Sequence, residues 1–411
     1  MKILHLNYSD QTGGAATSVM RLHKSLIKKK IQSYIFVKEK NSNEKNIIIK
    51  KSTISLIVDL LKKAILRNIK RILLPNLKST FSMNLLEGIK SNEISLYKPD
   101  VLNLHWISNE MISLKEISKI QTPVVWTLVD MWLFCGGEHY VQNKRYLNGY
   151  SESNKQLGEK IDVNRYIWKH KKKFLNKKVK IVCISKWLAK EAKKSKLLKE
   201  FDIRVINCTI DTDLWKPINK KIAKKILGLD PKRKILLFGA TGGTKDPRKG
   251  FKYLEEAIKS KELKNKVFDI LIFGEENNFK LKFKNQNIFF KSGKFYGNDI
   301  ALRTIYSAAD LIVAPSTQEA FGQVASEAGA CETPCVSFEN TGFEDVIIHK
   351  KTGYLAKFKK SKDLAYGISW CLNNNTKYKL GKQARKNIVS KFSNKVISSK
   401  YIKLYKEVTK K

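Results

Sequence analysis

The stretch QEAFGQVASE, residues 318–327, says most about the fold of this chain. An apolar run with a proline stop, LIVAP at 311–315, precedes it and has the pattern of a strand. Residues 323–330 have the pattern of a helix. A strand, a short loop and a helix therefore follow one another, and the free backbone amides at a helix N-terminus suit an anion such as phosphate.

Two carboxylates, Glu319 and Glu327, lie eight residues apart in this stretch. Glu319 falls on the loop, and Glu327 falls within the helix. A helix with one capping carboxylate and one solvated glutamate would show the same spacing. The Phe321-Gly322 pair and the continuation AGACETPCV at 328–336 favour a ligand site over that alternative.

Strand and helix patterns alternate along most of the chain, which is typical of α/β domains with parallel sheets. The first half shows strand patterns at 2–7, 33–38, 100–104, 123–127 and 180–184, and helical patterns at 14–30, 109–119 and 162–176. The second half shows strand patterns at 234–240, 267–274, 288–290, 311–316, 335–338 and 353–356. A length of 411 residues indicates two domains of roughly 200 residues each. The turn-rich connector NCTIDTDLWKP at 207–217 marks the boundary between them.

Basic residues number 80 against 37 acidic ones, a formal net charge of +43. Such an excess indicates an anionic partner, namely nucleic acid, anionic lipid or a nucleotide. Only ten of the basic residues are arginine, however, and the lysines are spread from end to end without interleaved aromatics. We therefore expect no specific nucleic-acid partner. General lysine enrichment and attraction to an anionic membrane face both remain as explanations.

Six cysteines are scattered through apolar runs, and the one close pair, Cys331 and Cys335, has no second pair to complete a zinc site. We expect reduced, buried thiols in a cytosolic protein. The N-terminal residues MKILHLNYSD enter a strand pattern at once, without the apolar core of a signal peptide. No run of eighteen uncharged apolar residues predicts a membrane-spanning helix.

Residues 53–78 predict an amphipathic helix. Its apolar side is predicted to hold Leu56, Ile57, Leu60, Leu61, Ala64, Ile65, Ile69, Ile72 and Leu73, and its cationic side Lys62, Lys63, Arg67, Lys70 and Arg71. Such a helix either lies on a membrane surface or packs on its own domain.

Three further segments carry candidate functional residues. Gly13-Gly14 is predicted to form a loop after the first strand and to begin a helix, where the backbone can approach an anion closely. A tight turn without any ligand would show the same pair of glycines. Lys249, in DPRKGF at 246–251, follows the strand at 234–240 and is either functional or solvated. On the first domain, His105-Trp106 ends one strand, and the segment TLVDMWLFCGGEHY at 127–140 follows another.

Together these motifs resemble glycosyltransferase family 4, whose members are retaining enzymes that use nucleotide sugars. The segment at 127–140 resembles a branch, of the colanic acid type, that builds bacterial surface polysaccharides. The resemblance covers nearly the whole chain and is most specific from Tyr306 to Tyr354. It implies the α/β GT-B fold, in which two Rossmann-like domains with parallel sheets face each other across a cleft. The implied parts are an acceptor-side domain at 1–206, a linker at 207–217, a nucleotide-sugar domain at 218–390 and a C-terminal helix at 391–411 that crosses back to the first domain.

The resemblance also implies residue roles. Glu319 would position the transferred sugar and Glu327 would hold the ribose. Lys249, with Arg248 or Lys245, would stabilise the leaving diphosphate, and Asp130 would orient an acceptor hydroxyl. The implied donor-binding set is Gly13, Gly14, Lys249, Glu319, Phe321, Gly322, Gln323, Val324, Ala325 and Glu327. The acceptor-side set is His105, Trp106, Asp130 and His139.

The predicted function is transfer of a hexose or related sugar from a nucleoside diphosphate to a surface glycan such as lipopolysaccharide or capsule. The expected acceptor is linked to polyprenyl diphosphate at the inner face of the plasma membrane, and no metal or other cofactor is expected. Two positions depart from the family pattern: Val129 stands where a histidine is usual, and Ala240 where an arginine is usual. Together with the high net charge, they motivate one alternative, a non-catalytic sugar-nucleotide or polyanion-binding protein on the same fold. A second alternative is another enzyme on this fold, a nucleotide-sugar epimerase or a glycan phosphorylase.

Overall fold

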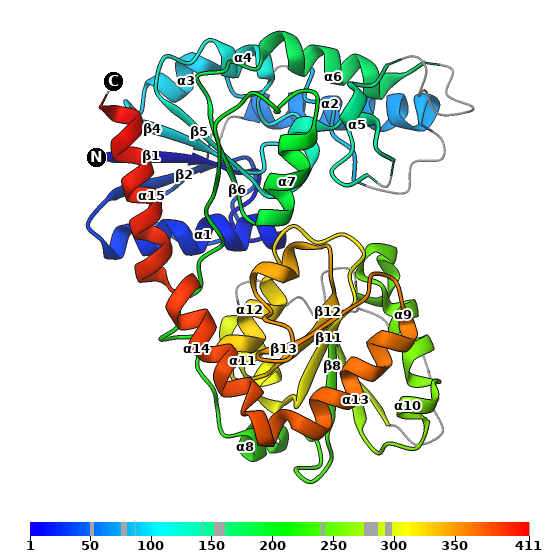
Figure 1. The fold of residues 1–411 in the computed structure, drawn as a ribbon. Coiled ribbons are helices and arrows are strands. Elements are labelled where there is room, and N and C mark those ends of the chain that lie inside the picture. Colours follow the sequence, from blue (N-terminus) through cyan, green and yellow to red (C-terminus); the bar gives the residue numbers. More distant parts are fainter. Residues whose placement is uncertain are drawn as a thin grey trace. The chain divides into compact units, whose positions relative to one another are not determined.

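The computed structural model describes residues 1–49, 53–74, 80–86, 88–141, 143–151, 161–239, 243–274, 287–291 and 298–410, without the side chains of 53–60, 63, 290 and 291. These residues form two compact units (Figure 1). The first comprises Met1–Ile184, Leu188–Ile206 and Tyr401–Lys411, and the second comprises Ser185–Trp187 and Asn207–Lys400. The connector predicted at 207–217 thus belongs to the second unit.

The first unit is built on a parallel seven-stranded sheet of order β3-β2-β1-β4-β5-β6-β7. Its strands are β1 (Lys2–Leu6), β2 (Gln32–Val37), β3 (Ile47–Ile49), β4 (Val101–Leu104), β5 (Val124–Leu128), β6 (Lys180–Cys183) and β7 (Ile203–Val205). Its helices are α1 (Gly13–Lys28), α2 (Thr53–Leu73), α3 (Ser91–Ser95), α4 (Leu114–Ser118), η1 (Trp132–Phe134), α5 (Arg145–Asn148), α6 (Val163–Phe174) and α7 (Lys186–Lys194). Figure 1 shows α1 on one side of the sheet and α3, α4 and α6 on the other. Because helices cover both faces, the central strands β4 and β5 are mostly apolar and are buried along their length.

The second unit contains a parallel six-stranded sheet of order β10-β9-β8-β11-β12-β13. Its strands are β8 (Ile235–Gly239), β9 (Asp269–Phe273), β10 (Ile288–Lys291), β11 (Leu311–Ala314), β12 (Cys335–Phe338) and β13 (Gly353–Ala356). Its helices are α8 (Lys220–Ile226), η3 (Gly243–Lys245), η4 (Pro247–Lys249), α9 (Phe251–Ile258), α10 (Lys261–Lys264), α11 (Asp299–Ala308), α12 (Gln323–Ala330), η5 (Gly342–Asp345), α13 (Ser361–Tyr378) and α14 (Leu380–Phe392). The predicted two-unit α/β architecture with parallel sheets is therefore confirmed.

The last helix, α15 (Asn394–Thr409), begins in the second unit and ends in the first. Within the first unit, the Tyr405 hydroxyl lies 2.6 Å from Asn103 Nδ2, which donates to it. The Tyr401 hydroxyl lies 3.3 Å from Thr127 Oγ1. These buried polar contacts fix the end of the chain against β4 and β5.

Each sheet has one point where the strand order reverses, and in such sheets ligands bind outside the carboxyl ends of the strands at that point. In the first sheet the reversal lies between β1 and β4, and in the second it lies between β8 and β11. Ligand sites are therefore expected at the loops that follow these four strands.

Several local predictions differ from the structure. The strands β3 and β7 were not predicted; each has only three residues. The helix predicted at 109–119 is wrong over its first half and begins only at Leu114. Asn109 and Glu110 adopt positive φ angles of 56° and 57°, which a right-handed helix excludes. Ser113 then caps the helix by accepting a bond from Glu116 N.

All six cysteines are buried and free, in agreement with the predicted buried thiols. Within the described ranges, no helix is long and apolar enough to cross a bilayer.

The amphipathic helix predicted at 53–78 is present as α2 at Thr53–Leu73, and residues 75–79 lie outside the described part. The apolar residues predicted on one side of this helix are not all packed in the same way. Ile69 and Leu73, together with Leu66, pack against a buried cluster of Phe81, Met83, Val163 and Ile167. In contrast, Leu61, Ile65 and Ile72 are exposed by 59%, 53% and 76%. Lys70, predicted on the cationic side, is anchored to the unit by donating to Phe81 O at 2.6 Å.

Candidate active site

Lys249 and Glu319 form an ion pair in the second unit, with Lys249 Nζ 2.7 Å from Glu319 Oε2. Lys249 ends η4 on the segment that follows β8, and Glu319 lies on the loop that follows β11. Because β8 and β11 flank the reversal of strand order, the sheet topology itself brings the two side chains together. Both side chains are mostly buried, 19% and 17% exposed, so their charges interact through less water than those of a surface pair.

Backbone contacts hold these two loops close together. Gly250 has a φ of +71°, and a Cβ atom there would lie 2.0 Å from Pro315 O. Thr317 N donates to Arg248 O at 2.7 Å, and Gly342 N donates to Glu319 O at 2.8 Å. The position of Glu319 is therefore set by main-chain bonds rather than by its own side chain.

Arg248, the predicted companion of Lys249, pairs with Asp246 instead, with Nη2 2.6 Å from Oδ2. Asp246 also accepts from Arg248 N at 2.9 Å and so caps η4. Lys245, the other predicted companion, is exposed, and Ala240 lies outside the described residues. Lys249 is thus the predicted cation that directly contacts Glu319. Among the described residues, no three His, Cys, Asp or Glu side chains are grouped to hold a metal ion.

The helix predicted at 323–330 is confirmed as α12, and it starts directly after the Glu319 loop. Its N-cap, Gly322, has a φ of +94° and no side chain that could accept a bond from the first-turn amides. A Cβ atom at Gly322 would lie 2.3 Å from the Phe343 ring, so this position needs glycine for space as well as for φ. The helix terminus at Gln323 and Val324 thus carries no side-chain cap from Gly322, and its amides and dipole favour an anion there.

Two members of the predicted donor-binding set are core residues. Phe321 is 1% exposed and packs edge-on against Phe392, with ring centroids 5.6 Å apart. Ala325 is 2% exposed. Their side chains support the loop and the helix rather than face solvent.

Glu327 lies on α12 and is 6% exposed. Its Oε2 accepts a hydrogen bond from the Tyr306 hydroxyl at 2.8 Å. Tyr306, on α11, is itself held between Trp215 and Phe273, with centroids 5.9 and 5.8 Å away. The carboxylate predicted to hold a ribose is therefore fixed by an aromatic neighbour that sequence reasoning did not identify.

We expect Glu327→Ala to weaken nucleoside diphosphate binding by about 1–3 kcal/mol, because a charge-assisted hydrogen bond is lost. Calorimetry with UDP and GDP measures this change. Tyr306→Phe is the matched variant, since it keeps the carboxylate and removes only the hydroxyl that orients it, and it should weaken binding less. Unchanged affinity of Glu327→Ala for both nucleotides would remove Glu327 from the donor site.

In the first unit, the predicted residues Trp106, Asp130 and His139 come together. His139 Nδ1 lies 2.6 Å from Asp130 Oδ2, and Trp106 Nε1 donates to the same oxygen at 3.0 Å. His139 Nε2 lies 2.9 Å from Ser82 Oγ. Asp130 Oδ1 accepts from Trp132 N at 2.9 Å. Both ring nitrogens of His139 thus lie within hydrogen-bond distance of a side chain, and the ring is held against Asp130.

His105 does not join this hydrogen-bonded group. Its Nε2 lies 3.0 Å from His5 Nδ1, and burial lowers the pKa of His105 to about 3, so the ring is neutral. It does line a small space of about 10 Å³ together with Trp106, Val129 and Asp130. Such a space is about the size needed for one water molecule.

A buried lysine that the sequence did not reveal lies beneath the Asp130–His139 segment. Lys171 Nζ donates to the carbonyl oxygens of Trp132, Cys135 (3.2 Å) and Gly136 (2.5 Å), and it lies 3.7 Å from the centroid of the Trp132 ring. Burial lowers the pKa of Lys171 to about 7, while negative neighbours that include Glu138 act in the opposite direction. Lys171 therefore serves as an internal cation around which the segment folds.

Gly13 and Gly14 open α1 on the loop after β1, at the reversal point of the first sheet. Gly13 has a φ of +87°, which explains the glycine, and α1 has neither a side-chain cap nor an acidic residue in its first turn. A second helix N-terminus whose N-cap side chain makes no capping bond thus lies at a carboxyl edge, in the first unit.

Comparison with known proteins identifies the class. Residues 12–214 match the family described as Glycosyltransferase Family 4, and residues 219–387 match the family described as Glycosyl transferases group 1. The fold is similar to HepE from Anabaena in complex with UDP-glucose, with a TM-score of 0.67, 17% identity and coverage of 99% of this chain and 100% of that one. The chain belongs to the family 4 glycosyltransferases of the GT-B fold.

Two curated relatives are similar over part of their length. N-acetyl-alpha-D-glucosaminyl L-malate synthase from Bacillus anthracis is 30% identical over 115 residues, 28% of this chain and 30% of that protein. The capsular polysaccharide biosynthesis glycosyltransferase CapM from Staphylococcus aureus is 28% identical over 103 residues, 25% of this chain and 27% of that protein. The chain therefore matches about a third or less of the length of these two relatives.

Proposed function

We propose that the protein transfers a hexose or related sugar from a nucleoside diphosphate to a hydroxyl of a growing surface glycan, with retention of the anomeric configuration. The observation that carries this proposal is the Lys249–Glu319 pair at the reversal point of the second sheet, next to the N-terminus of α12, whose N-cap is Gly322. Glu327, held by Tyr306, supports a ribose site in the same unit.

In the proposed reaction, the bond between the sugar anomeric carbon and the diphosphate oxygen breaks. The acceptor oxygen bonds to the same carbon on the same face, and its proton passes to the departing diphosphate. Negative charge builds on the phosphate as the bond breaks, so a fixed cation at Lys249 and the α12 amides lower the barrier. Glu319 exchanges its bond to Lys249 for the sugar hydroxyls and thereby positions the sugar.

The donor and the stereochemistry can be tested together. A thermal-shift panel of UDP-, GDP- and ADP-sugars should give stabilisation by at least one nucleotide, because a ligand that binds only the folded state raises its stability. NMR of the product from that donor should show the donor's anomeric configuration. An inverted product would contradict the retaining mechanism. Epimerised or hydrolysed donor without any transfer would support the epimerase alternative, and tight donor binding without turnover would support a non-catalytic protein.

The relative CapM supports a glycan acceptor, because its name places it in capsular polysaccharide biosynthesis. HepE, crystallised with UDP-glucose, supports a nucleotide-sugar donor. We further propose that the acceptor is linked to polyprenyl diphosphate and that the protein works in the cytoplasm at the inner face of the plasma membrane.

We expect activity to survive exhaustive EDTA treatment, because Lys249 and the α12 terminus supply the positive charge that a metal would otherwise supply. Transfer rates before and after chelation measure this. Loss of activity that Mn²⁺ restores would contradict a metal-free reaction.

We also expect α2 to bind anionic vesicles through its exposed apolar residues Leu61, Ile65 and Ile72, with Arg67 and Arg71 exposed beside them. Each basic residue near an anionic surface contributes about 1 kcal/mol. Arg67→Gln with Arg71→Gln should therefore weaken flotation with phosphatidylserine vesicles at physiological salt.

The charge-matched control is Lys382→Gln with Lys386→Gln, two exposed lysines of the second unit, and it should float like the wild type. If the wild-type protein fails to float even at low salt, α2 is only a packing helix of its unit.

A further inference from the structure

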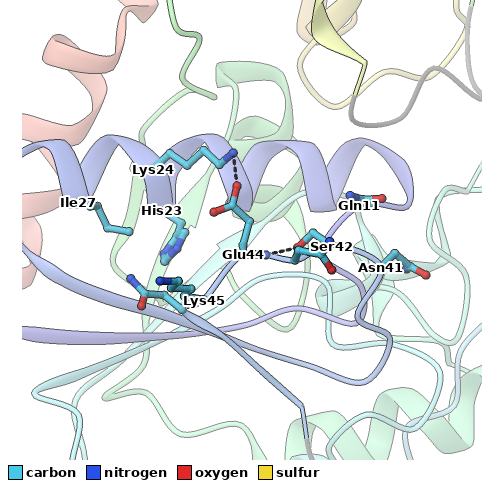
Figure 2. A pocket seen from close by; sticks show the side chains of 10 residues that line it. Gln11, His23, Lys24, Ile27, Asn41, Ser42, Glu44 and Lys45 are labelled. Atoms are coloured by element: carbon cyan, nitrogen blue, oxygen red, sulfur yellow. Dashed lines mark hydrogen bonds and ion pairs between the residues drawn. The ribbon is translucent and has the colours of Figure 1, made fainter.

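A polar groove runs along α1 in the first unit, outside the candidate active site. It lies between α1 and the segment 38–46 that joins β2 to β3, and its volume is about 650 Å³. Figure 2 shows Gln11 and Asn41 at one end and His23 and Ile27 toward the other. This volume is within the range of pockets that take small molecules.

The groove is held in shape by bonds from both of its sides. The buried carboxylate of Asp10 accepts from Asn41 N and Ser42 N, each at 2.8 Å. Farther along, Lys24 of α1 reaches Glu44 of the opposite segment at 2.6 Å (Figure 2). The segment is therefore tied to the end of β1 and to α1, so the groove exists before any ligand arrives.

The lining is rich in uncharged groups that both donate and accept hydrogen bonds. The carboxamides of Gln11, Asn43 and Asn46 line the groove and make no side-chain hydrogen bond to any described residue. The carboxamide of Asn41 donates one hydrogen bond, to Ser9 Oγ at 3.3 Å. A carboxamide offers two donors and an acceptor, which matches the donor–acceptor character of hydroxyl groups.

The charged groups of the lining are mostly neutralised. Lys24 and Glu44 pair with each other, and His23 is neutral because burial lowers its pKa to about 4. Lys45 adds a single positive charge. Ile27, 41% exposed, adds an apolar surface of the kind that packs against the carbon–hydrogen face of a sugar ring. This set of groups fits a neutral, hydroxyl-rich ligand better than a polyanion.

The groove begins at the carboxyl edge of the first sheet. Gln11 follows β1 and stands two residues before Gly13, and Asn41 follows β2, so both are at the carboxyl ends of the strands. From there the groove follows α1 away from that edge toward Ile27. A chain whose end is at the carboxyl edge of the first sheet can therefore continue along the groove.

We propose that this groove binds a neutral, hydroxyl-rich stretch of the acceptor glycan, away from the hydroxyl that reacts. The proposal rests on the proposed function, because it requires a glycan acceptor. It adds a subsite for acceptor length and charge whose lining does not include Asp130 of the same unit.

The test uses the full-length protein, with maltohexaose, cellohexaose and chitohexaose as neutral probes and hexagalacturonate as the anionic probe. Saturation-transfer NMR should detect binding of at least one neutral hexasaccharide. The double variant Asn43→Ala/Asn46→Ala should weaken that binding about tenfold, as expected for the loss of two hydrogen bonds. Asn92→Ala, an exposed asparagine of the same unit, should leave it unchanged.

Donor binding, measured by calorimetry with UDP and GDP, distinguishes failure of the proposed function from failure of the groove as a glycan subsite. If neither nucleotide binds, the proposed function fails. If a nucleotide binds but no neutral hexasaccharide does, or if the double variant binds it as well as the wild type, the groove is not a glycan subsite. Tighter binding of hexagalacturonate than of every neutral probe would also overturn the proposal.

Discussion

Replacing Lys249 by alanine is expected to lower turnover by about 100-fold or more, as for the loss of one preorganised charge stabiliser. The ammonium lies 2.7 Å from Glu319, the residue proposed to position the sugar, on the loop after the neighbouring strand. Charge on the departing diphosphate grows only as the bond breaks, so the loss should fall on the turnover number more than on donor affinity. Steady-state rates at saturating donor, with calorimetry of donor binding, measure both.

Two controls make this result specific. Lys245→Ala removes an exposed lysine four residues away and should leave turnover nearly unchanged. Glu319→Gln keeps the shape of the side chain but breaks the ion pair, and it tests whether Lys249 acts without its partner. A Lys249→Ala enzyme with weak donor binding but normal turnover at saturation would remove Lys249 from the chemistry. A large loss of turnover in Lys245→Ala alone would indicate that Lys245, rather than Lys249, stabilises the departing diphosphate.

Arg248 shows why the companion of Lys249 could not be chosen from the sequence. Both Arg248 and Lys245 lie within four residues of Lys249, and either could reach a phosphate. The structure pairs Arg248 with Asp246, because Asp246 caps the short helix η4 and therefore lies beside the guanidinium. Such a choice depends on loop geometry that spacing does not encode.

The strands and helices that position the candidate site were predictable from local pattern. The apolar run before residue 316, the glycine at 322 and the helix at 323–330 are short-range signals, and all three are present in the structure. The same holds for the strand before Lys249, present as β8. Parallel strands then bring Glu319 and Lys249 to one edge, although 70 residues separate them along the chain.

The supporting residues were not predictable, because their partners are distant in sequence. Tyr306 reaches Glu327 across 21 residues, Ser82 reaches His139 across 57, and Lys171 reaches Trp132 across 39. No period or motif marks such contacts. A lysine among the many lysines of this chain gives no sign that it is buried, and only the packing of α6 against the 132–136 segment reveals it.

Lys171→Met is expected to lower the free energy of unfolding of the first unit by about 3 kcal/mol or more. A methionine fills much of the same volume but removes the lysine donor from the buried carbonyl oxygens of Cys135 and Gly136, while Trp132 O keeps its bond from Cys135 N. Each buried polar group left unsatisfied costs about 1–3 kcal/mol, and the contact of the ammonium with the Trp132 ring is lost as well. Urea unfolding and hydrogen exchange of residues 130–139 measure the effect.

The matched variant is Lys169→Met, two residues earlier on the same helix, where the side chain is exposed. It makes the same chemical change without removing a buried donor, so its stability should stay within about 0.5 kcal/mol of the wild type. UDP and GDP affinity should be retained in both variants, because Glu327 and Lys249 belong to the other unit. Faster hydrogen exchange at 130–139 in Lys171→Met alone would show that this lysine holds the Asp130–His139 segment. Equal protection in both variants would mean that the segment folds without its internal cation, and the carbonyl contacts would then be incidental to the arrangement of Asp130 and His139.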